Sequence, residues 1–225
     1  MNLHRLRKDV LVWMATHTCK AHRHAYITHP TCYEKEQPRG KEKLAFVDIE
    51  ASNLDADFGM ILSWCVKADG GIIHSDVLTL ADINEFKVGY EDYRVVASLI
   101  GTLSMFDRIV THYGNDFRYD IPFIRTRSVA MGLPFPAYGS IKHSDTYPIL
   151  KKKFKLSRNR QEVAVRALLG STEKNHIDGA IWRAASRGDA KSLAYILDHN
   201  KRDVRDLEKL YHKIVGFVKG SEVSI

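Results

Sequence analysis

Along this chain, short apolar runs alternate with segments in which apolar residues recur every three or four positions. The first pattern predicts strands and the second predicts helices. Short apolar runs predict strands at 43–51, 59–68, 71–80 and 108–113. The tight-turn sequence Asp69-Gly70-Gly71 stands between the second and third runs, so these two are expected to form a hairpin.

Apolar residues that recur every three or four positions predict helices at 91–105, 120–131 and 161–169, and from 190 toward the C-terminus. Gly170 is placed to end the third of these helices, and Asp189 is placed to cap the last one. The last helix has the clearest apolar stripe, which consists of Leu193, Leu197, Asn200, Val204, Leu207, Tyr211 and Ile214.

The order of these elements predicts the fold class. Three antiparallel strands come first and helices alternate with strands after them, which indicates a mixed β-sheet flanked by helices. An α/β fold of the RNase H-like type has this order, whereas no G-x-G-x-x-G follows the first strand as a Rossmann fold would require. We expect this domain at 41–225, after a Cys/His-rich segment at 1–40 that Pro38-Arg39-Gly40 separates from it.

Composition and charge narrow the class of partner. The 225 residues are 44% hydrophobic, which supports a packed core and excludes a disordered chain. The net charge of +7 favours DNA or RNA as a partner, because contacts to phosphates release counterions. A generic basic protein would have the same charge, and protein partners are left open.

The same features indicate a compartment. No run of about 18 apolar residues is present, so no membrane span is expected. The basic N-terminus is not followed by the long apolar core of a signal peptide, and three cysteines do not make a disulfide framework. These features predict a cytoplasmic or nucleoid-associated protein that is not secreted.

Asp48 and Glu50 are the most informative polar residues of the chain. They follow the apolar run at 44–47, and residues two apart on a strand point to the same face. Burying two carboxylates is costly unless something compensates, and a divalent cation is the usual compensation. The alternative is a strand end with two solvated acids.

Two later positions offer partner acids. Asp120 would begin a helix directly after a strand and a loop, where the helix dipole stabilises an acid; Asp116 is the competing acid in that loop. Asp203 and His199 would share one face of the last helix. The alternatives are an ordinary first-turn Asp and an exposed polar pair.

Together these motifs resemble the DEDD superfamily of 3′–5′ exonucleases, which have an RNase H-like fold. They fall at the end of the first strand, at a helix start and in the last helix, and the resemblance spans 43–215. The segments that carry it are Phe46-Val47-Asp48-Ile49-Glu50, Tyr119-Asp120-Ile121-Pro122-Phe123-Ile124 and His199-Asn200-Lys201-Arg202-Asp203.

One motif departs from the family pattern. The third motif of the family is either Y-x-x-x-D or H-x-x-x-x-D, and this chain has a histidine at the tyrosine spacing. Either His199 replaces the tyrosine, or the helix presents the histidine from a slightly different angle.

The resemblance implies a mechanism. Two Mg²⁺ or Mn²⁺ ions would be held by Asp48, Glu50, Asp120 and Asp203, and mononucleotides would be released from a 3′ end. His199 would act as general base near neutral pH, since an imidazole has an ordinary pKa of about 6.5. Spacing alone implies only a metal-dependent phosphodiesterase. A catalytically weak nucleic-acid-binding module and a structure-selective endonuclease on the same fold stay open as alternatives.

A basic run between the second and third motifs is a candidate contact for nucleic acid. It would follow a phosphate backbone, with Phe154 stacked on a base; the alternative is a solvated loop. Arg118, Arg125 and Arg127 flank the second motif and are further candidates for phosphate contact. The residues predicted in the basic run are Lys151, Lys152, Lys153, Phe154, Lys155, Arg158 and Arg160.

The N-terminal segment contains paired metal-ligand residues. Cys19 and His22 form C-x-x-H, and His29 and Cys32 form H-x-x-C, with His24 as an alternative to His22. Ligand pairs with this spacing suit tetrahedral Zn²⁺ and would order a segment that has little core of its own. The alternative is a basic, His-rich tail that touches nucleic acid.

Overall fold

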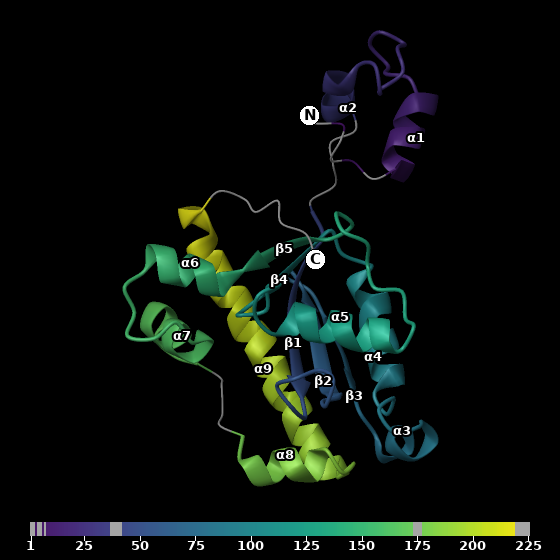
Figure 1. Cartoon of the computed structure of the whole chain (residues 1–225). Coiled ribbons are helices and arrows are strands. Elements are labelled where there is room, and N and C mark those ends of the chain that lie inside the picture. Colours follow the sequence, from purple (N-terminus) through teal and green to yellow (C-terminus); the bar gives the residue numbers. More distant parts are fainter. Residues whose placement is uncertain (1–2, 4–5, 7, 37–41, 173–176, 219–225) are drawn as a thin grey trace. The chain divides into compact units, whose positions relative to one another are not determined.

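The computed structural model describes residues 3, 6, 8–36, 42–172 and 177–218 (Figure 1). The chain forms two compact units, residues 1–42 and 43–225. The predicted break at Pro38-Arg39-Gly40 lies outside the described residues.

The N-terminal unit contains two short helices, α1 (Lys8–Thr16) and α2 (Pro30–Glu36), which its weak hydrophobic pattern did not predict. Its small core includes Met14 and Tyr26, and the ring of Trp13 stacks on that of Tyr26 at 5.5 Å.

The larger unit is built on one five-stranded sheet with the strand order β3-β2-β1-β4-β5. Antiparallel pairing joins β1 to β2 and β2 to β3, whereas β1–β4 and β4–β5 are parallel. The expected mixed sheet is therefore confirmed, and β1 is its central strand. The strands are β1 (Leu44–Ala51), β2 (Ile61–Ala68), β3 (Ile73–Val77), β4 (Arg108–Thr111) and β5 (Lys142–Asp145).

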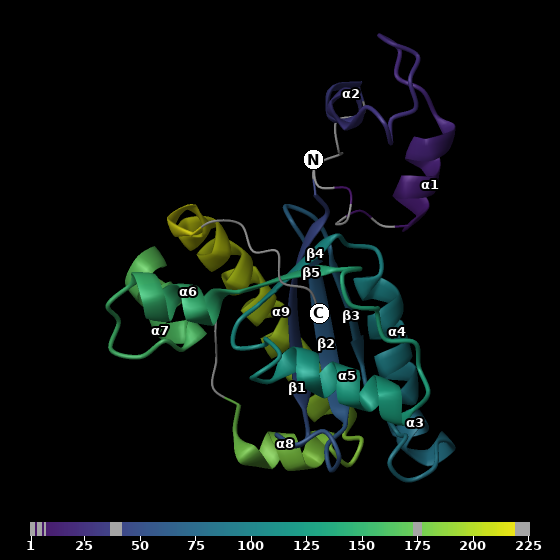
Figure 2. The ribbon, with the colours of Figure 1, turned by 45° about the horizontal axis from the view of Figure 1, so that its top comes forward.

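Helices cover both faces of this sheet (Figures 1 and 2). Residues Ala45, Val47 and Ile49 of β1 join the core that contains α4 and α5, while Phe46 packs on the other face against Val204 and neighbouring residues of α9. The helices of this unit are α3 (Leu80–Glu85), α4 (Tyr93–Leu103), α5 (Asp120–Ala130), α6 (Thr146–Lys153), α7 (Gln161–Leu169), α8 (Gly179–Ala185) and α9 (Ala190–Ile214), followed by a 3₁₀ turn at Val215–Phe217.

The turn and capping predictions are also confirmed. Gly70 has a φ of 63° in the β2–β3 turn, and Gly170 ends α7 with a φ of 89°. The side chain of Asp189 accepts a hydrogen bond from the backbone N–H of Ser192 and caps α9.

Four elements described in the larger unit were not predicted, namely β5, α3, α6 and α8. Strand β5 has the sequence Lys142-His143-Ser144-Asp145, which has no apolar run. The third strand is shorter than predicted because Thr79 and Asp82 form a capping box that starts α3. Lys151–Lys153 form the last turn of α6, where cations interact favourably with the helix dipole, so this part of the basic run is helical.

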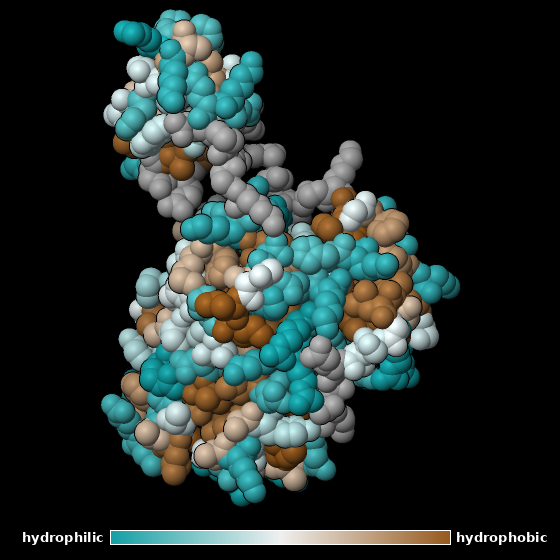
Figure 3. Space-filling model, turned by 180° about the vertical axis from the view of Figure 1, so that it is seen from behind, coloured by the Kyte–Doolittle hydropathy of each residue, from teal (hydrophilic) through white to brown (hydrophobic). Residues whose placement is uncertain are grey.

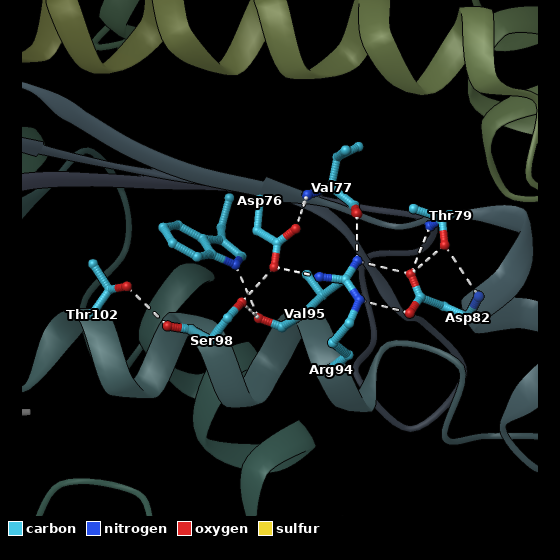
Figure 4. A network of polar contacts seen from close by, with 9 residues as sticks. Asp76, Val77, Thr79, Asp82, Arg94, Val95, Ser98 and Thr102 are labelled. Carbon is cyan, nitrogen blue, oxygen red and sulfur yellow. Dashed lines mark hydrogen bonds and ion pairs between the residues drawn. The ribbon is translucent and has the colours of Figure 1, made fainter.

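Charged side chains beside α4 form two structural networks. Arg94 donates to Asp76 and Asp82, with Nη1–Oδ2 and Nε–Oδ1 distances of 2.6 and 2.7 Å (Figure 4). Arg127 donates to the fully buried Asp92, whose Oδ2 also accepts from the backbone N–H of Ile61. The prediction that Arg127 contacts phosphate is therefore wrong, because its guanidinium is buried against Asp92.

One face of the larger unit has a surface of mixed hydropathy (Figure 3). On the face seen in Figure 3, hydrophilic residues interleave with separate apolar patches. Among the described helices, none combines the length and the apolar character that a membrane crossing requires.

Candidate active site

Asp48 and Glu50 lie on the face of β1 that α9 covers. In the β1–β2 register Asp48 is opposite Cys65 and Glu50 is opposite Ser63, and the register shifts immediately after Glu50. A local irregularity of this kind often redirects side chains at functional sites. Both carboxylates are half-buried, whereas Ile49 between them enters the core of the opposite face.

Asp120 reaches β1 from the start of α5. The β1–β4 register runs from Leu44 to Phe46, and beyond it the backbone N–H of Ile49 donates to Asp120 Oδ1 at 3.3 Å. The carboxylate of Asp120 thus lies against the strand between the two acids of the first motif.

A tight turn before α5 makes room for this carboxylate. Tyr113 has a φ of 67°, which is uncommon for a residue other than glycine. A Cβ on the next residue, Gly114, would lie 2.4 Å from Asp120 Oδ2 and 2.5 Å from Thr111 Oγ1. Only glycine therefore fits here without displacing Asp120.

Helix α9 adds His199 and Asp203 from its buried face. His199 Nε2 lies 3.7 Å from Glu50 Oε1 and 3.5 Å from Asp203 Oδ2. Ligand atoms of these three residues all lie within 4.8 Å of one another. The long stripe of α9 packs on the sheet, and this packing brings a motif 150 residues away in the sequence to β1.

Electrostatics supports a shared acidic centre. Burial raises the pKa of Tyr119, and the charges of Asp120, Glu50 and Asp48 raise it further, so all three acids lie near this phenol. Burial raises the pKa of Asp120 to about 7, although hydrogen bonds from backbone N–H groups partly offset it.

Several residues of the site were missed in the sequence. Asp145 is a further buried carboxylate; burial raises its pKa, and its charge in turn raises that of Asp120. Its side chain accepts from the backbone N–H groups of Tyr113, Asn115 and Tyr147 and so holds the turn that presents Asp120. The one sequence signal for Asp145 was its position as the N-cap of a helix. This signal was missed because Asp145 ends a strand whose residues are polar.

Two buried amides fix α9 and α7 at the site. Asn200 Nδ2 donates to the backbone carbonyl of Asp48 at 3.3 Å, which ties α9 directly to β1. Gln161 Nε2 donates to the backbone carbonyl of Asp203 at 2.9 Å. Asn200 was visible as a polar residue in the apolar stripe, whereas Gln161 had no distinguishing signal.

The donor set fits divalent cations. Carboxylate oxygens are the ligands that Mg²⁺ and Mn²⁺ prefer, and Asp120 is a buried carboxylate whose pKa shift shows that its charge is poorly compensated. Asp48, Glu50, Asp120 and Asp203 can supply these oxygens, and His199 adds one nitrogen.

Arg118 lies on an exposed aromatic surface beside the second motif. Its guanidinium lies 4.7 Å from the ring centre of Tyr113 and 5.4 Å from that of Tyr147, and Nη1 donates to the Tyr113 hydroxyl. Phe117 in the same loop is 91% exposed. The competing acid Asp116 instead pairs with Arg125, with an Nη2–Oδ1 distance of 2.6 Å.

The cationic side chains of the predicted basic run are exposed, but its aromatic residue is packed. Lys151, Lys152 and Lys153 extend from the end of α6, and Lys155, Arg158 and Arg160 follow them. The ring of Phe154 contacts that of Phe217 edge to face at 5.2 Å and packs on the α6–α7–α9 core. Phe154 would have to leave this packing in order to stack on a base.

The N-terminal unit gathers four of its five candidate ligands. Cys32 Sγ lies 3.3 Å from His22 Nδ1 and 3.1 Å from His29 Nδ1, and Cys19 Sγ lies 3.9 and 4.0 Å from the same two nitrogens. A tetrahedral zinc ion would set such S–N separations at about 3.5 Å. His24 is exposed and is not part of the group.

Comparisons with known proteins agree with this architecture. The family B DNA polymerase of the hyperthermophilic archaeon Pyrobaculum calidifontis has a similar structure, with a TM-score of 0.63 and 19% sequence identity. The match covers 79% of this chain but only 25% of the polymerase, and at this identity it shows the fold alone. No curated protein sequence matches the chain. The profile of the RNase H superfamily matches residues 45–215, and the chain therefore belongs to the RNase H superfamily, with an RNase H-like fold.

Proposed function

We propose that the unit 43–225 is a metal-dependent nuclease that hydrolyses phosphodiester bonds of DNA or RNA from the 3′ end. The observation that carries this proposal is the convergence of Asp48, Glu50, Asp120 and Asp203 at the central strand of an RNase H-like sheet. The fold is shared with a DNA polymerase, which acts on a nucleic acid, and the net charge of +7 suits the same class of substrate.

Two Mg²⁺ or Mn²⁺ ions are the proposed cofactors, held by Asp48, Glu50, Asp120 and Asp203. Such ions would lower the pKa of water and stabilise the charge on the leaving oxygen. The protein's own contribution is to hold the carboxylates in place. Asn200 and Gln161 anchor α9, and Gly114 leaves the space that Asp120 occupies.

Substrate binding is assigned to two surfaces. Arg118 and Tyr113 flank the second motif and present a cation and an aromatic face, which suit a phosphate and a base. Lys151–Lys153 with Lys155, Arg158 and Arg160 provide an exposed basic surface for the phosphate backbone.

A nuclease assay tests the proposal. End-labelled single- and double-stranded DNA and RNA are incubated with Mg²⁺, Mn²⁺ or chelator, and Asp48→Ala and Asp120→Asn are compared with wild type. Asp116→Asn is the matched control, because Asp116 lies in the same loop but pairs with Arg125. A ladder that starts at the 3′ end, needs metal and disappears only in the site variants supports the proposal.

Other outcomes contradict it in defined ways. Binding without cleavage in every metal would identify a nucleic-acid-binding module. Internal cuts at one structure would identify an endonuclease.

We also propose that Cys19, His22, His29 and Cys32 hold a zinc ion that orders the N-terminal unit. The ligand separations of 3.1–4.0 Å support this assignment. Metal analysis should find one zinc per wild-type chain, a loss of zinc in Cys32→Ser and retention in His24→Ala. Zinc far below one per wild-type chain would overturn it.

A further inference from the structure

Three rings of the N-terminal unit form a continuous stack that ends at the surface. The ring of Trp13 lies 4.1 Å from that of His17 at an interplanar angle of 12°, and 5.5 Å from that of Tyr26 at 14°. Tyr26 is only 2% exposed, whereas His17 is exposed. The stack therefore begins in the core of the unit and ends at an exposed imidazole. A nucleobase can extend such a stack, because every base has a π-face.

Hydrogen bonds hold the imidazole of His17 in this position. Its Nδ1 lies 2.9 Å from the backbone carbonyl of Trp13 and 3.0 Å from the hydroxyl of Thr16. A carbonyl oxygen can only accept, so Nδ1 carries a proton and donates to it. A ring that is already fixed in one orientation loses little conformational freedom when a base stacks on it.

The hairpin that follows His17 carries two exposed cations. A β-bridge between Thr18 and Ala25 closes the hairpin, and Lys20 and Arg23 are exposed in its loop. Arg23 has a φ of 57°, a backbone conformation that glycine adopts readily and other residues rarely adopt. The loop thus keeps a cation where glycine would be less strained, and strain of this kind is concentrated at functional sites.

Glu36 connects the ring stack to this loop. Its Oε2 accepts from the hydroxyl of Tyr26 at 3.2 Å and from the backbone N–H of Lys20 at 2.6 Å. Its Oε1 accepts from the backbone N–H of Ala21 at 3.3 Å. One carboxylate therefore holds the inner end of the stack and the start of the loop, so the rings and the cations form one preorganised surface.

Positive charge is concentrated in the same unit. Residues 1–42 contain eight lysines and arginines and four aspartates and glutamates, which gives a net charge of +4 in less than a fifth of the chain. The rest of the chain contributes only +3 of the total of +7. Such a charge favours a polyanion as the partner, because contacts to phosphates release counterions.

We propose that the N-terminal unit binds an unpaired strand of DNA or RNA, with a base stacked on His17 and phosphates at Lys20 and Arg23. An unpaired strand fits because its bases can offer a face to a protein ring, whereas a base within a duplex has a stacked neighbour on each face. The stack and the loop both belong to the N-terminal unit, so the inference goes beyond the proposed function and does not depend on it.

Fluorescence anisotropy of labelled oligonucleotides tests this inference. The full-length chain, purified without chelator and free of Mg²⁺ and Mn²⁺, is titrated with single-stranded DNA, single-stranded RNA and duplex DNA at several salt concentrations. His17→Ala removes the stacking ring, His17→Phe keeps an aromatic face, and Arg23→Gly removes the cation from the loop. Lys35→Ala is the matched control, because Lys35 is an exposed cation of the same unit but lies on α2.

We expect His17→Ala to weaken binding of a single strand by about fivefold or more, and His17→Phe to bind like wild type. Arg23→Gly should bind more weakly and lower the slope of log K against log salt by about 0.7, whereas Lys35→Ala should change neither quantity to this extent. The melting temperature of Arg23→Gly should be unchanged or higher, because glycine relieves the strained φ. Its weaker binding therefore cannot result from unfolding.

Photo-cross-linking locates the bound base. Single strands that contain 5-iodouracil are irradiated in complex with each protein, and the cross-linked peptides are identified by mass spectrometry. We expect a cross-link at Trp13 or His17 in wild type and its loss in His17→Ala.

Unchanged affinity in His17→Ala, or the absence of a cross-link at Trp13 and His17 in wild type, would overturn the proposal. Equal weakening of single-strand and duplex binding by His17→Ala would also contradict it. An effect with DNA alone or RNA alone would support it and identify the strand. The readout is independent of cleavage, so binding through His17 by a chain that cleaves nothing would support this inference and overturn the proposed function.

Discussion

Asp82 and Asp120 are two carboxylates of one unit with almost equal burial, at 4% and 3% exposure, and with opposite electrostatics. Burial opposes the charge of Asp82, but hydrogen bonds from Arg94 and Thr79 outweigh it and hold its pKa below the ordinary value. Burial raises the pKa of Asp120 to about 7, and only backbone N–H groups oppose that rise.

This difference in charge compensation distinguishes a region that stabilises the fold from the candidate active site. The carboxylates beside α4 are matched by guanidinium groups of the same chain, Asp76 and Asp82 by Arg94 (Figure 4) and Asp92 by Arg127, so their charges need no compensation from outside the chain. The charge of Asp145 raises the pKa of Asp120, and the charges of Asp120, Glu50 and Asp48 raise the pKa of Tyr119. A divalent cation would compensate the charge of Asp120, as Arg94 and Arg127 compensate the charges of the carboxylates beside α4.

The sharpest test exchanges one carboxylate in each region for an amide. Asp92→Asn leaves the buried guanidinium of Arg127 without its charge partner and should lower the free energy of unfolding by about 3–5 kcal/mol. Asp120→Asn removes a charge that burial disfavours, so it should raise that free energy in chelator at pH 8. Urea unfolding of both variants measures this, and a destabilised Asp120→Asn would refute the distinction.

The raised pKa of Asp120 predicts that the stability of the metal-free protein depends on pH. Between about pH 4 and 7 the folded chain keeps a proton on Asp120 that the unfolded chain has released, so stability should fall as pH rises through this window. His143 acts in the opposite sense, because burial lowers its pKa to about 4 and stability is lost as pH falls below 6.5.

Comparing wild type with Asp120→Asn isolates the Asp120 contribution, since both proteins contain His143. The stability difference between them should grow from pH 5 to pH 8 in chelator and shrink when Mn²⁺ is added. A difference that is constant with pH would contradict the raised pKa of Asp120.

Gly114→Ala tests the space around Asp120. The added methyl would lie 2.4 Å from Asp120 Oδ2, so we expect a loss of about 1–3 kcal/mol of stability and weaker Mn²⁺ binding. Gly101→Ala in α4 is the control, because its Cβ meets no atom within 4 Å and alanine favours a helix by about 0.5–1 kcal/mol. Equal Mn²⁺ affinity in Gly114→Ala and wild type would exclude this positioning role.

The smallest effect is expected for Asp76→Asn on the structural side. Asp76 accepts from Arg94 and Ser98, but the Arg94 side chain is 41% exposed, so the loss should be about 1 kcal/mol. Thermal unfolding measures this loss, and calorimetry should find Mn²⁺ binding unchanged. Altered Mn²⁺ affinity would show that the two regions are coupled.

Sequence patterns predicted the elements whose apolar residues follow one period. The central strand, the hairpin at Gly70 and the stripe of α9 were all recognised, because periodicity and turn chemistry act over a few residues. Strand β5 was missed because its pairing with β4 stabilises it and its own residues are polar. Arg127 was misassigned because its partner Asp92 lies 35 residues away.

By itself, the sequence determined the local pairs: Asp48 with Glu50 two residues apart on a strand, His199 with Asp203 one helical turn apart, and the two Cys–His pairs of the N-terminal unit. Only the tertiary structure decided which pairs meet. The rise of a strand and the pitch of a helix set distances within a pair, whereas packing of α9 on β1 sets those between Glu50 and His199. The same packing brought in Asn200, and packing of α7 against α9 brought in Gln161; both contacts arise only between elements far apart in the chain.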